Sequence, residues 1–313
     1  MVNKYLEQLK KKKRYIVNYS TPKEGVEELL KISPNVKKGY IGSFSISSSD
    51  IKIYKIEKPS LIINGIELIG TEISKYLILL NSKSQGYRRK TLEILETTPP
   101  PLFAKPGTYE NYIYVDIKSC YFSLLTKLWG IKYCRGEYLG FSKNTEFFIP
   151  PEFMPILQEY KEIRNALYGM LRVRTRTKFI VNNDNIDFKI EKSKNNLLYP
   201  DIPLGIMDIT QAIATIAIKD FGCVYVAIDG FIIPQKHLIN FIEFLQGLGL
   251  KTGVKAEGEA IIKNYYTYQI GKIETKNYKQ IETAKEIKTN LIFNPKEAKE
   301  IINKFKPFLS KNI

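Results

Sequence analysis

Histidine and closely spaced cysteines are nearly absent from this sequence of 313 residues. There is one histidine, His237, and the three cysteines, Cys120, Cys134 and Cys223, are far apart. Structural zinc sites need closely spaced Cys and His ligands, and disulfide frameworks need an even set of cysteines, so both are excluded in practice. Histidine-based triads and Cys–His dyads are poor candidates for the same reason. Any catalysis is expected to rest on carboxylates, metal ions and cationic side chains.

Long apolar runs are also lacking. No run approaches the roughly 20 residues that a helix needs to cross a bilayer. The N-terminal stretch MVNKYLEQLKKKKR carries charge where a signal peptide has an apolar core. We therefore expect a reducing, cytoplasmic setting and no membrane partner.

Acidic residues are outnumbered by basic ones. The chain has 48 Lys and Arg against 32 Asp and Glu, a net charge of +16, while 44% of its residues are hydrophobic. That apolar content is enough for a buried core and argues against disorder throughout. The excess of positive charge attracts polyanions. A basic protein with carboxylate chemistry points toward phosphoryl transfer on nucleic acid.

A run of three prolines, Pro99 to Pro101, divides the chain. Proline lacks an amide donor and fixes φ, so this stretch is predicted to be an extended connector and a domain boundary. Before it, LIINGIELIG is typical of two short strands around an Asn-Gly turn. Beyond it, helices are expected over about 203–220 and 236–248, and a basic helical tail is expected from about 271.

Two aspartates end apolar segments that are typical of buried strands. Asp116 follows YIYV, and Asp229 lies between CVYVAI and FIIP in an Asp-Gly hairpin signal. Two carboxylates side by side repel each other unless a cation lies between them. Two divalent ions held there could activate a hydroxyl and stabilise a leaving pyrophosphate. The alternative is that Asp229 only supplies turn geometry.

The segment from Pro151 to Leu171 has a helical period. Four side chains spaced i, i+3, i+4 and i+7 are predicted to share one face of it: Lys161, Arg164, Asn165 and Tyr168. A Lys, an Arg and an amide together can hold a triphosphate, and an aromatic one turn further on can pack against a base. The alternative is an ordinary solvated helix face.

A basic alternation follows this helix in RVRTRTKFIV. Arg172, Arg174, Arg176 and Lys178 are predicted to share one face of a strand, where they could track a phosphate backbone. The alternative is a charged strand edge that prevents aggregation.

Four motifs in this order resemble those of family B DNA polymerases, over about residues 106–268. They are Asp-x-x-Ser-x-Tyr-Pro-Ser, Lys-x-x-x-Asn-x-x-Tyr-Gly, Tyr-x-Asp-Thr-Asp-Ser and Lys-x-Tyr. The matching positions, motif by motif, are Asp116, Ser119, Tyr121 and Ser123; Lys161, Asn165, Tyr168 and Gly169; Tyr225 and Asp229; and Lys263 and Tyr265.

The resemblance implies an α+β fold. It would be a polymerase palm, an antiparallel sheet with packed helices, joined to short helical fingers at about 150–172. The domains expected are an N-terminal nucleic-acid-binding or accessory domain over 1–100, a catalytic palm and fingers over 101–270, and a tail or minimal thumb over 271–313.

The resemblance also implies a role for each matching residue. Asp116 and Asp229 would hold two Mg²⁺ ions, or Mn²⁺ in their place. Lys161, Arg164 and Asn165 would grip the dNTP triphosphate, Tyr121 would lie under its sugar, and Tyr168 would contact the nascent base pair. Lys263 and Tyr265 would hold the primer end, with Arg172, Arg174 and Arg176 on the DNA backbone.

Three departures from the family pattern matter. Phe122 replaces the proline of the first motif, and Ala227 and Gly230 replace the first aspartate and the serine of the third. Losing one acid lowers the negative charge available to metals. Asp50 is the only aspartate before the proline run, so an exonuclease site built on several acids is not expected.

The sequence therefore predicts a template-directed DNA polymerase without proofreading exonuclease. Its partners would be a DNA primer–template and dNTP, with a replication partner needed for processivity. Its small size suggests a viral or plasmid origin and hence a host cytoplasm. The alternatives are a primase or terminal transferase on the same palm, and a catalytically inactive palm acting as a DNA-binding subunit.

Overall fold

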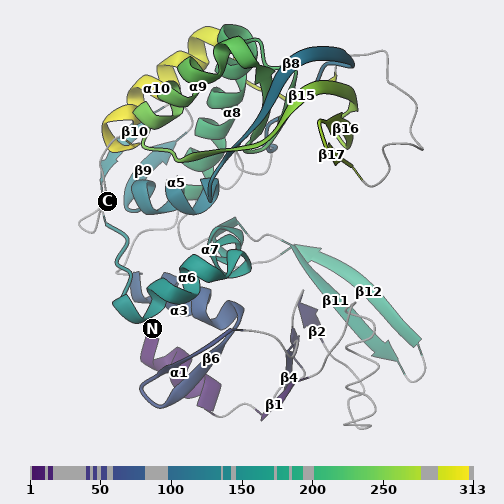
Figure 1. Ribbon diagram of the computed structural model, residues 1–313. Helices are drawn as coiled ribbons and strands as arrows, with labels where there is room; N and C mark the ends of the chain where they lie inside the picture. Colours follow the sequence, from purple (N-terminus) through teal and green to yellow (C-terminus); the bar gives the residue numbers. More distant parts are fainter. Residues whose placement is uncertain are drawn as a thin grey trace. The chain divides into compact units, whose positions relative to one another are not determined.

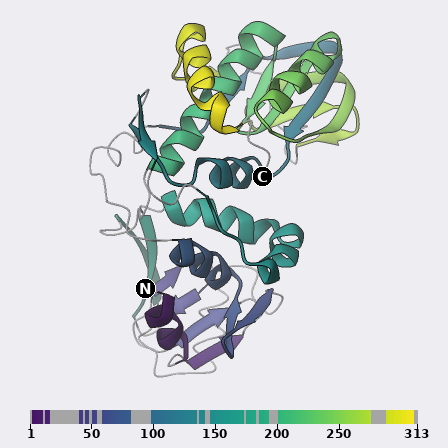
Figure 2. The ribbon, with the colours of Figure 1, turned by 90° about the vertical axis from the view of Figure 1, so that its left-hand side faces the viewer.

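The computed structural model divides the chain into two compact units (Figures 1 and 2). One joins Met1–Gly86 with Phe148–Leu198, and the other joins Tyr87–Phe147 with Tyr199–Ile313. The three functional domains expected from the sequence stay a prediction, because a division of the chain by internal contacts assigns no function to either unit. The residues described are 2–10, 13–16, 40–42, 45–47, 51–54, 59–81, 98–134, 137–141, 146–172, 175–182, 185–192, 201–275 and 288–309.

The first unit contains short helices and small two-stranded sheets. The Asn-Gly hairpin predicted within it is confirmed, because Asn64 and Gly65 both have positive φ and join two paired strands. The elements are α1 (Val2–Lys10), β1 (Lys13–Ile16), β2 (Tyr40–Gly42), β3 (Ser45–Ser47), β4 (Ile51–Tyr54), β5 (Ser60–Ile63), β6 (Ile66–Ile69), α3 (Thr71–Asn81), η1 (Pro151–Phe153), α6 (Met154–Glu159), α7 (Lys161–Arg172), β11 (Thr175–Asn182) and β12 (Asn185–Lys192).

The helix expected from 151 to 171 is broken at Tyr160, which has φ −101° and ψ 101°. A break leaves helix carbonyls without their usual amide donors. Here the guanidinium of Arg164 donates to the carbonyls of Leu157 and Gln158, the second at 2.9 Å. One side chain thus compensates for the backbone bonds lost between α6 and α7.

The second unit is built on one eight-stranded sheet in the order β17-β16-β15-β8-β14-β13-β7-β18. Every pairing in it is antiparallel, as predicted. The elements of this unit are β7 (Leu102–Ala104), β8 (Gly107–Ile117), α5 (Cys120–Leu128), β9 (Ile131–Cys134), β10 (Glu137–Phe141), α8 (Asp201–Phe221), β13 (Tyr225–Ala227), β14 (Gly230–Pro234), η2 (Gln235–His237), α9 (Leu238–Gly247), β15 (Thr252–Asn264), β16 (Thr267–Ile270), β17 (Ile273–Glu274), β18 (Lys288–Thr289) and α10 (Pro295–Leu309).

One face of this sheet is covered by helices. Val115 of β8 and Phe231 of β14 are fully buried, and the ring of Phe231 lies 5.2 Å from that of Phe241 in α9. Helix α8 packs behind β14 and against α5 and α10. Among the described helices, only α8 is long and apolar enough to span a membrane, but 94% of its apolar window is buried inside the protein. It is the core helix of the unit.

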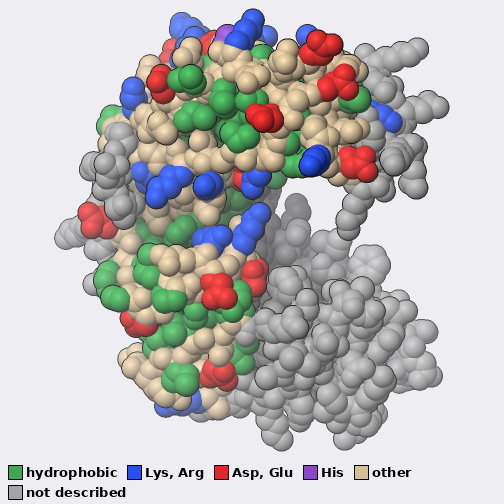
Figure 3. Space-filling view, in the orientation of Figure 1, with side chains coloured by type: hydrophobic (Ala, Val, Ile, Leu, Met, Phe, Trp, Pro, Cys, Tyr) green, Lys and Arg blue, Asp and Glu red, His purple; other side chains and the backbone are tan. Residues whose placement is uncertain are grey.

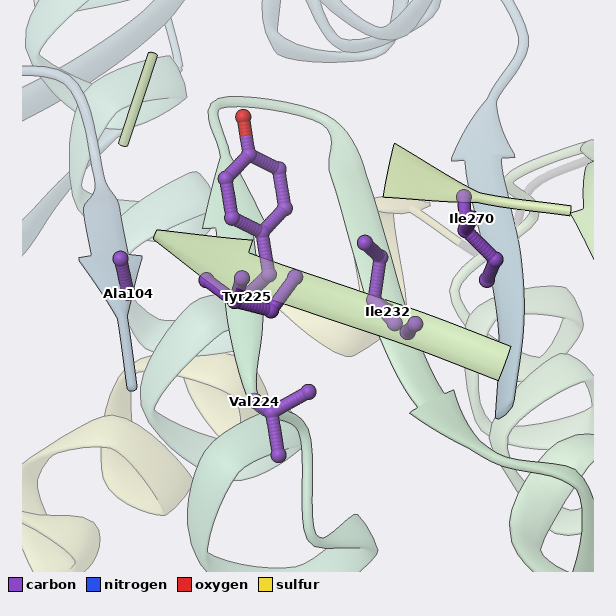
Figure 4. Close-up of a cluster of buried hydrophobic side chains, with 7 residues drawn as sticks. Ala104, Val224, Tyr225, Ile232 and Ile270 are labelled. Carbon is purple, nitrogen blue, oxygen red and sulfur yellow. The ribbon is translucent and has the colours of Figure 1, made fainter. Parts of the chain in front are cut away.

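The other face of the sheet is rich in tyrosine. Successive strand residues point to opposite faces, so Tyr112, Tyr114 and Asp116 lie on the side away from Val115. A cluster that includes Ala104, Tyr225 and Ile232 fills the middle of this face (Figure 4). Strand β15 pairs with β8 and also contacts β7, so the sheet curls around this cluster.

Candidate active site

One candidate aspartate, Asp116, lies on β8, and the other, Asp229, lies in the turn that leads into the neighbouring strand β14, at the same end of the sheet. Asp116 is near the end of β8, and in the register of β8 and β14 it stands opposite Gly230. Asp229 directly precedes Gly230, and its carbonyl accepts a hydrogen bond from the amide of Ile117 at 2.9 Å. The two acids, 113 positions apart in the sequence, thus come to the same end of one antiparallel sheet; that they share metal ions stays a prediction.

The hairpin that carries Asp229 differs from the one expected. Ala227 pairs with Gly230, so the turn residues are Ile228 and Asp229, and not Asp229 and Gly230. The amide of Asp229 donates to the carbonyl of Ala227 at 2.8 Å across Ile228, which has φ 63°. A β-branched residue at positive φ stores strain, on the order of 1–3 kcal/mol. The amide of Ile228 donates to the carbonyl of Pro101 at 2.9 Å, which helps to hold the turn.

Gly230 is required for space and not for turn geometry. Its φ is not positive, but a Cβ at this position would lie 2.6 Å from the hydroxyl of Tyr114. Real Cβ atoms do not come so close to another heavy atom. The tyrosine ring therefore occupies the place where the third motif has its serine.

Asp116 has a glycine on each neighbouring strand. Its partner on β14 is Gly230, and its partner on β15 is Gly253. A Cβ at Gly253 would lie 2.9 Å from Cε of Lys118, so the Lys118 side chain passes over this glycine. Neither partner has a side chain of its own, and the space above the two glycines is filled by Tyr114 and Lys118.

Lys255 contacts the Asp116 carboxylate directly. Its Nζ lies 3.2 Å from Oδ2 of Asp116, whose side chain is 23% exposed. The register of β15 on β8 shifts between Val254 and Ala256, so Lys255 is the extra residue of a β-bulge. Bulges re-aim side chains and are common beside active sites. The negative charge of the Asp116 carboxylate is therefore balanced locally by the ammonium of Lys255.

Tyr114 lies near this carboxylate and packs with two further tyrosines. The ring of Tyr268 lies 5.8 Å from that of Tyr114 and 4.6 Å from that of Tyr225. Burial is the main cause that raises the pKa of Tyr114, followed by a hydrogen bond with Tyr268 and by nearby groups that include Asp116. The Tyr114 phenol therefore stays neutral near neutral pH, where it can donate a hydrogen bond.

Cys120 lies at the start of α5, near both acids. Burial raises the pKa of its thiol well above the ordinary value, and Asp229 and Asp116 add to the shift. A thiol held protonated is a poor nucleophile and a poor metal ligand. The chemistry at this end of the sheet is therefore left to the carboxylates.

The number of acidic side chains limits how many metal ions this site can hold. Across the described residues, no group of three or more His, Cys, Asp or Glu side chains is placed to hold a metal ion. Mg²⁺ is often held by one or two carboxylates together with water and substrate phosphates. Asp116 and Asp229 fit that description for one ion, and a second would depend mostly on ligands from a substrate.

Comparisons with known proteins give only distant likenesses. No protein-family model matches the sequence, and no curated protein matches it. DNA polymerases are among the solved structures that it resembles. They include the phi29 DNA polymerase with single-stranded DNA and with primer–template DNA, each at 12% identity and a TM-score of 0.42. Another is the family B DNA polymerase of the archaeon Pyrobaculum calidifontis, at 11% identity and a TM-score of 0.36.

The likeness is also partial. It covers 64% of this chain in each case, but 54% of the phi29 polymerase and 31% of the archaeal enzyme. This chain thus spans about half or less of the polymerases that it matches. At these values the function has to be argued from the residues themselves.

The primer-contact residues predicted from the sequence lie elsewhere along the sheet. Lys263 follows Ile262, which pairs with Gly107 at the opposite end of β8 from Asp116. The carbonyl of Tyr265 accepts a hydrogen bond from the Tyr225 hydroxyl at 2.8 Å. Tyr268, which sequence reasoning did not select, is the aromatic residue of this hairpin that reaches Tyr114.

The residues predicted to bind the nucleotide belong mostly to α7, in the first unit. Lys161 and Asn165 are exposed, whereas Tyr168 is 6% exposed and lies with Ile163 and Leu167 on the buried side. The four side chains therefore do not form one solvated face. Tyr121, expected under the sugar, is a partly exposed residue in the first turn of α5, in the second unit.

The basic strand expected after α7 begins later than predicted. Arg172 is the last residue of α7, because the helix continues through the first residue of the alternation. Arg174 lies outside the described residues. Arg176 and Lys178 are in β11, opposite Glu191 and Lys189 of β12.

Proposed function

We propose that this chain is a template-directed DNA polymerase that joins a dNTP to a primer 3′-hydroxyl and has no proofreading exonuclease. The observation that carries the proposal is the position of Asp116 and Asp229. Asp116 lies near the end of β8, opposite Gly230, and Asp229 lies in the strained turn directly before Gly230. Such a pair of carboxylates fits a divalent-ion site for phosphoryl transfer.

In this proposal Asp116 and Asp229 hold Mg²⁺ or Mn²⁺. When bound, the metal would lower the pKa of the primer hydroxyl and neutralise charge on the triphosphate. Lys118 and Lys255 supply positive charge at the same end of the sheet.

The residues of α7 that are proposed to contact the nucleotide differ in how exposed they are. Lys161 and Asn165 are available at the surface to hold a triphosphate. Arg164 would first have to leave the carbonyls of α6. Tyr168 would act by packing, consistent with its burial. Tyr121 would support the sugar from α5.

DNA would be bound mainly through charge. The net charge of +16 favours a polyanionic partner, and Figure 3 shows lysine and arginine side chains in groups on the visible surface. Lys263 and Tyr265 would contact the primer backbone, and Arg172, Arg174 and Arg176 would contact duplex phosphates. Binding should weaken steeply as salt is raised.

A second candidate function is a catalytically inactive palm that binds DNA. Ala227 favours it, because it leaves the third motif with one acid. The ion pair between Asp116 and Lys255 favours it as well, because the lysine already neutralises one carboxylate. This candidate predicts salt-sensitive DNA binding without nucleotide incorporation.

Primer extension on a defined template with Mg²⁺ or Mn²⁺ tests both candidates. Asp116→Asn and Asp229→Asn should each lower the extension rate by about 100-fold or more, since each removes a proposed metal ligand. Asp220→Asn is the matched control, because Asp220 pairs with Lys299 at the end of α8, away from the site.

The outcomes separate the candidates clearly. Extension that both substitutions abolish and the control preserves supports the polymerase. Extension that survives Asp116→Asn or Asp229→Asn contradicts it. DNA binding without any extension by the unmodified chain supports the inactive palm.

A further inference from the structure

The Lys255 side chain forms an ion pair with the partly exposed Asp116 carboxylate. The lysine side chain is 51% exposed and the aspartate 23%, and Nζ lies 3.2 Å from Oδ2. A metal ion that binds this oxygen would compete with the ammonium for the same negative charge.

A β-bulge in β15 places Lys255 outside the regular pairing with β8. Val254 stands opposite Val115 and Ala256 stands opposite Tyr114, so Lys255 has no partner on β8. In a regular ladder Lys255 would itself stand opposite Tyr114. The bulge frees its side chain from that position.

The residues paired with Asp116 on the two adjacent strands are glycines, which have no side chain. Gly230 and Gly253 flank Asp116 on the two adjacent strands, and neither can cover the carboxylate. The spaces above them are taken by the Tyr114 hydroxyl and the Lys118 side chain. Lys255 is the residue that forms an ion pair with Asp116.

The charge balance at this end of the sheet suits one divalent ion better than two. Two carboxylates carry two negative charges, and Ala227 adds none where the third motif has an acid. Two divalent ions would bring four positive charges before any substrate arrives. Lys255 already brings one, at ion-pair distance from Asp116.

We propose that Lys255 is a tethered cation that takes one cation position beside Asp116, so that the site binds a single divalent ion. This inference rests on the proposed function, because it takes Asp116 and Asp229 to be the metal ligands. Lys255 is here a positioning residue for Asp116 and a competitor of the second ion.

Binding of Mn²⁺ alone to the full chain tests the inference without any measurement of activity. Free Mn²⁺ is followed by its electron paramagnetic resonance signal. Lys255→Gln removes the competing charge and should tighten Mn²⁺ binding about tenfold. Lys255→Met, which keeps the apolar stem, should do the same, and Lys255→Arg should bind as the unmodified chain does.

Two controls isolate the site. Lys296→Gln removes the same charge from an exposed position at the start of α10, and it should leave Mn²⁺ binding unchanged. Asp116→Asn added to Lys255→Gln should cancel the gain. Circular dichroism confirms that each variant is folded.

Failure of the inference and failure of the proposed function give different results. If Lys255→Gln and Lys255→Met bind Mn²⁺ no tighter than the unmodified chain, or if Lys296→Gln gains as much, the tethered cation is wrong. If Asp116→Asn and Asp229→Asn both leave Mn²⁺ binding unchanged, the acids are not the metal site and the proposed function itself fails.

Discussion

The two faces of the eight-stranded sheet differ sharply over a single residue step. Val115 and Phe231 point to the helices and are fully buried. Their immediate neighbours, Asp116 and Gly230, stand opposite each other on the other face. Alternation along a strand therefore separates apolar packing from candidate chemistry within the same two strands.

The difference separates the face of the sheet that provides stability from the face that carries the candidate site. The helix face gains its stability from close packing of rings such as Phe231 and Phe241. The tyrosine face keeps hydroxyls, two glycines and a charged pair near Asp116. Substitutions on the first face should change stability, and those on the second should mainly change metal binding and catalysis.

The largest effect on stability is expected from Phe231→Ala. Removing a buried ring leaves a cavity against α9, so the free energy of unfolding should fall by about 3–5 kcal/mol. Urea denaturation followed by circular dichroism measures it. Asp116→Asn, one strand away on the other face, should change stability by about 1 kcal/mol or less. Equal losses in the two variants would contradict the division between faces.

Gly230→Ala should have the next largest effect. Its Cβ would come 2.6 Å from the Tyr114 hydroxyl, so overpacking should cost about 1–3 kcal/mol. The same denaturation curves measure it. Gly247→Ala is the matched control: no atom lies within 4 Å of that Cβ, and the helix should gain up to about 1 kcal/mol.

A double-mutant cycle identifies the cause of the loss at Gly230. Tyr114→Ala should cost less in the Gly230→Ala background than in the unmodified chain, because it removes the group that the new Cβ meets. Strict additivity would show that Tyr114 is not the obstacle.

Ile228→Gly should have a smaller effect: it should raise the stability of the fold and slow primer extension. Glycine relieves the strain of a β-branched residue at φ 63°, but it adds freedom to the unfolded chain. The net gain should be about 1 kcal/mol, seen as a higher melting temperature. Primer extension should slow, because the turn that positions Asp229 becomes looser. A lower melting temperature would contradict the assignment of strain.

The smallest effect is expected from a thiol beside the tyrosine face. Burial raises the pKa of the Cys223 thiol to about 12. In the unfolded chain this thiol ionises at lower pH, so its contribution is complete below the unfolded pKa and is lost as pH rises toward 12. By pH 9.5 the loss should be about 1 kcal/mol. Cys223→Ala should show a correspondingly shallower fall in stability between pH 8 and pH 10, and identical slopes would contradict it.

The sequence was sufficient to predict the antiparallel sheet and the neighbouring positions of Asp116 and Asp229 on it. Apolar and aromatic residues before Asp116 and around Asp229 predicted strands, and antiparallel pairing then placed the strand ends together. The Asn-Gly hairpin and the long helix α8 were predicted for similar reasons, because their signals are local. These features depend on residues that are neighbours along the chain.

The features that were missed depend on contacts between distant segments. Lys255 reaches Asp116 through a bulge, and a bulge is defined only by the register of two strands. Gly230 was assigned to the turn because nothing in the sequence shows Tyr114 beside it. The break at Tyr160 is likewise compensated by Arg164, a side chain that was expected to serve a nucleotide.

The interleaving of the two units has a consequence for biosynthesis and for dissection of the chain. In the first unit, the Ser74 hydroxyl donates to the carbonyl of Ile163 at 2.8 Å, which joins α3 to a helix made much later by the ribosome. The strands β7 to β10 are translated in between and wait for their own helix, α8. A protease cut at the proline run would therefore divide the first unit, with α3 in one fragment and α7 in the other, while the second unit would stay almost whole in the C-terminal fragment. Co-expression of the two fragments should restore the first unit better than either fragment alone.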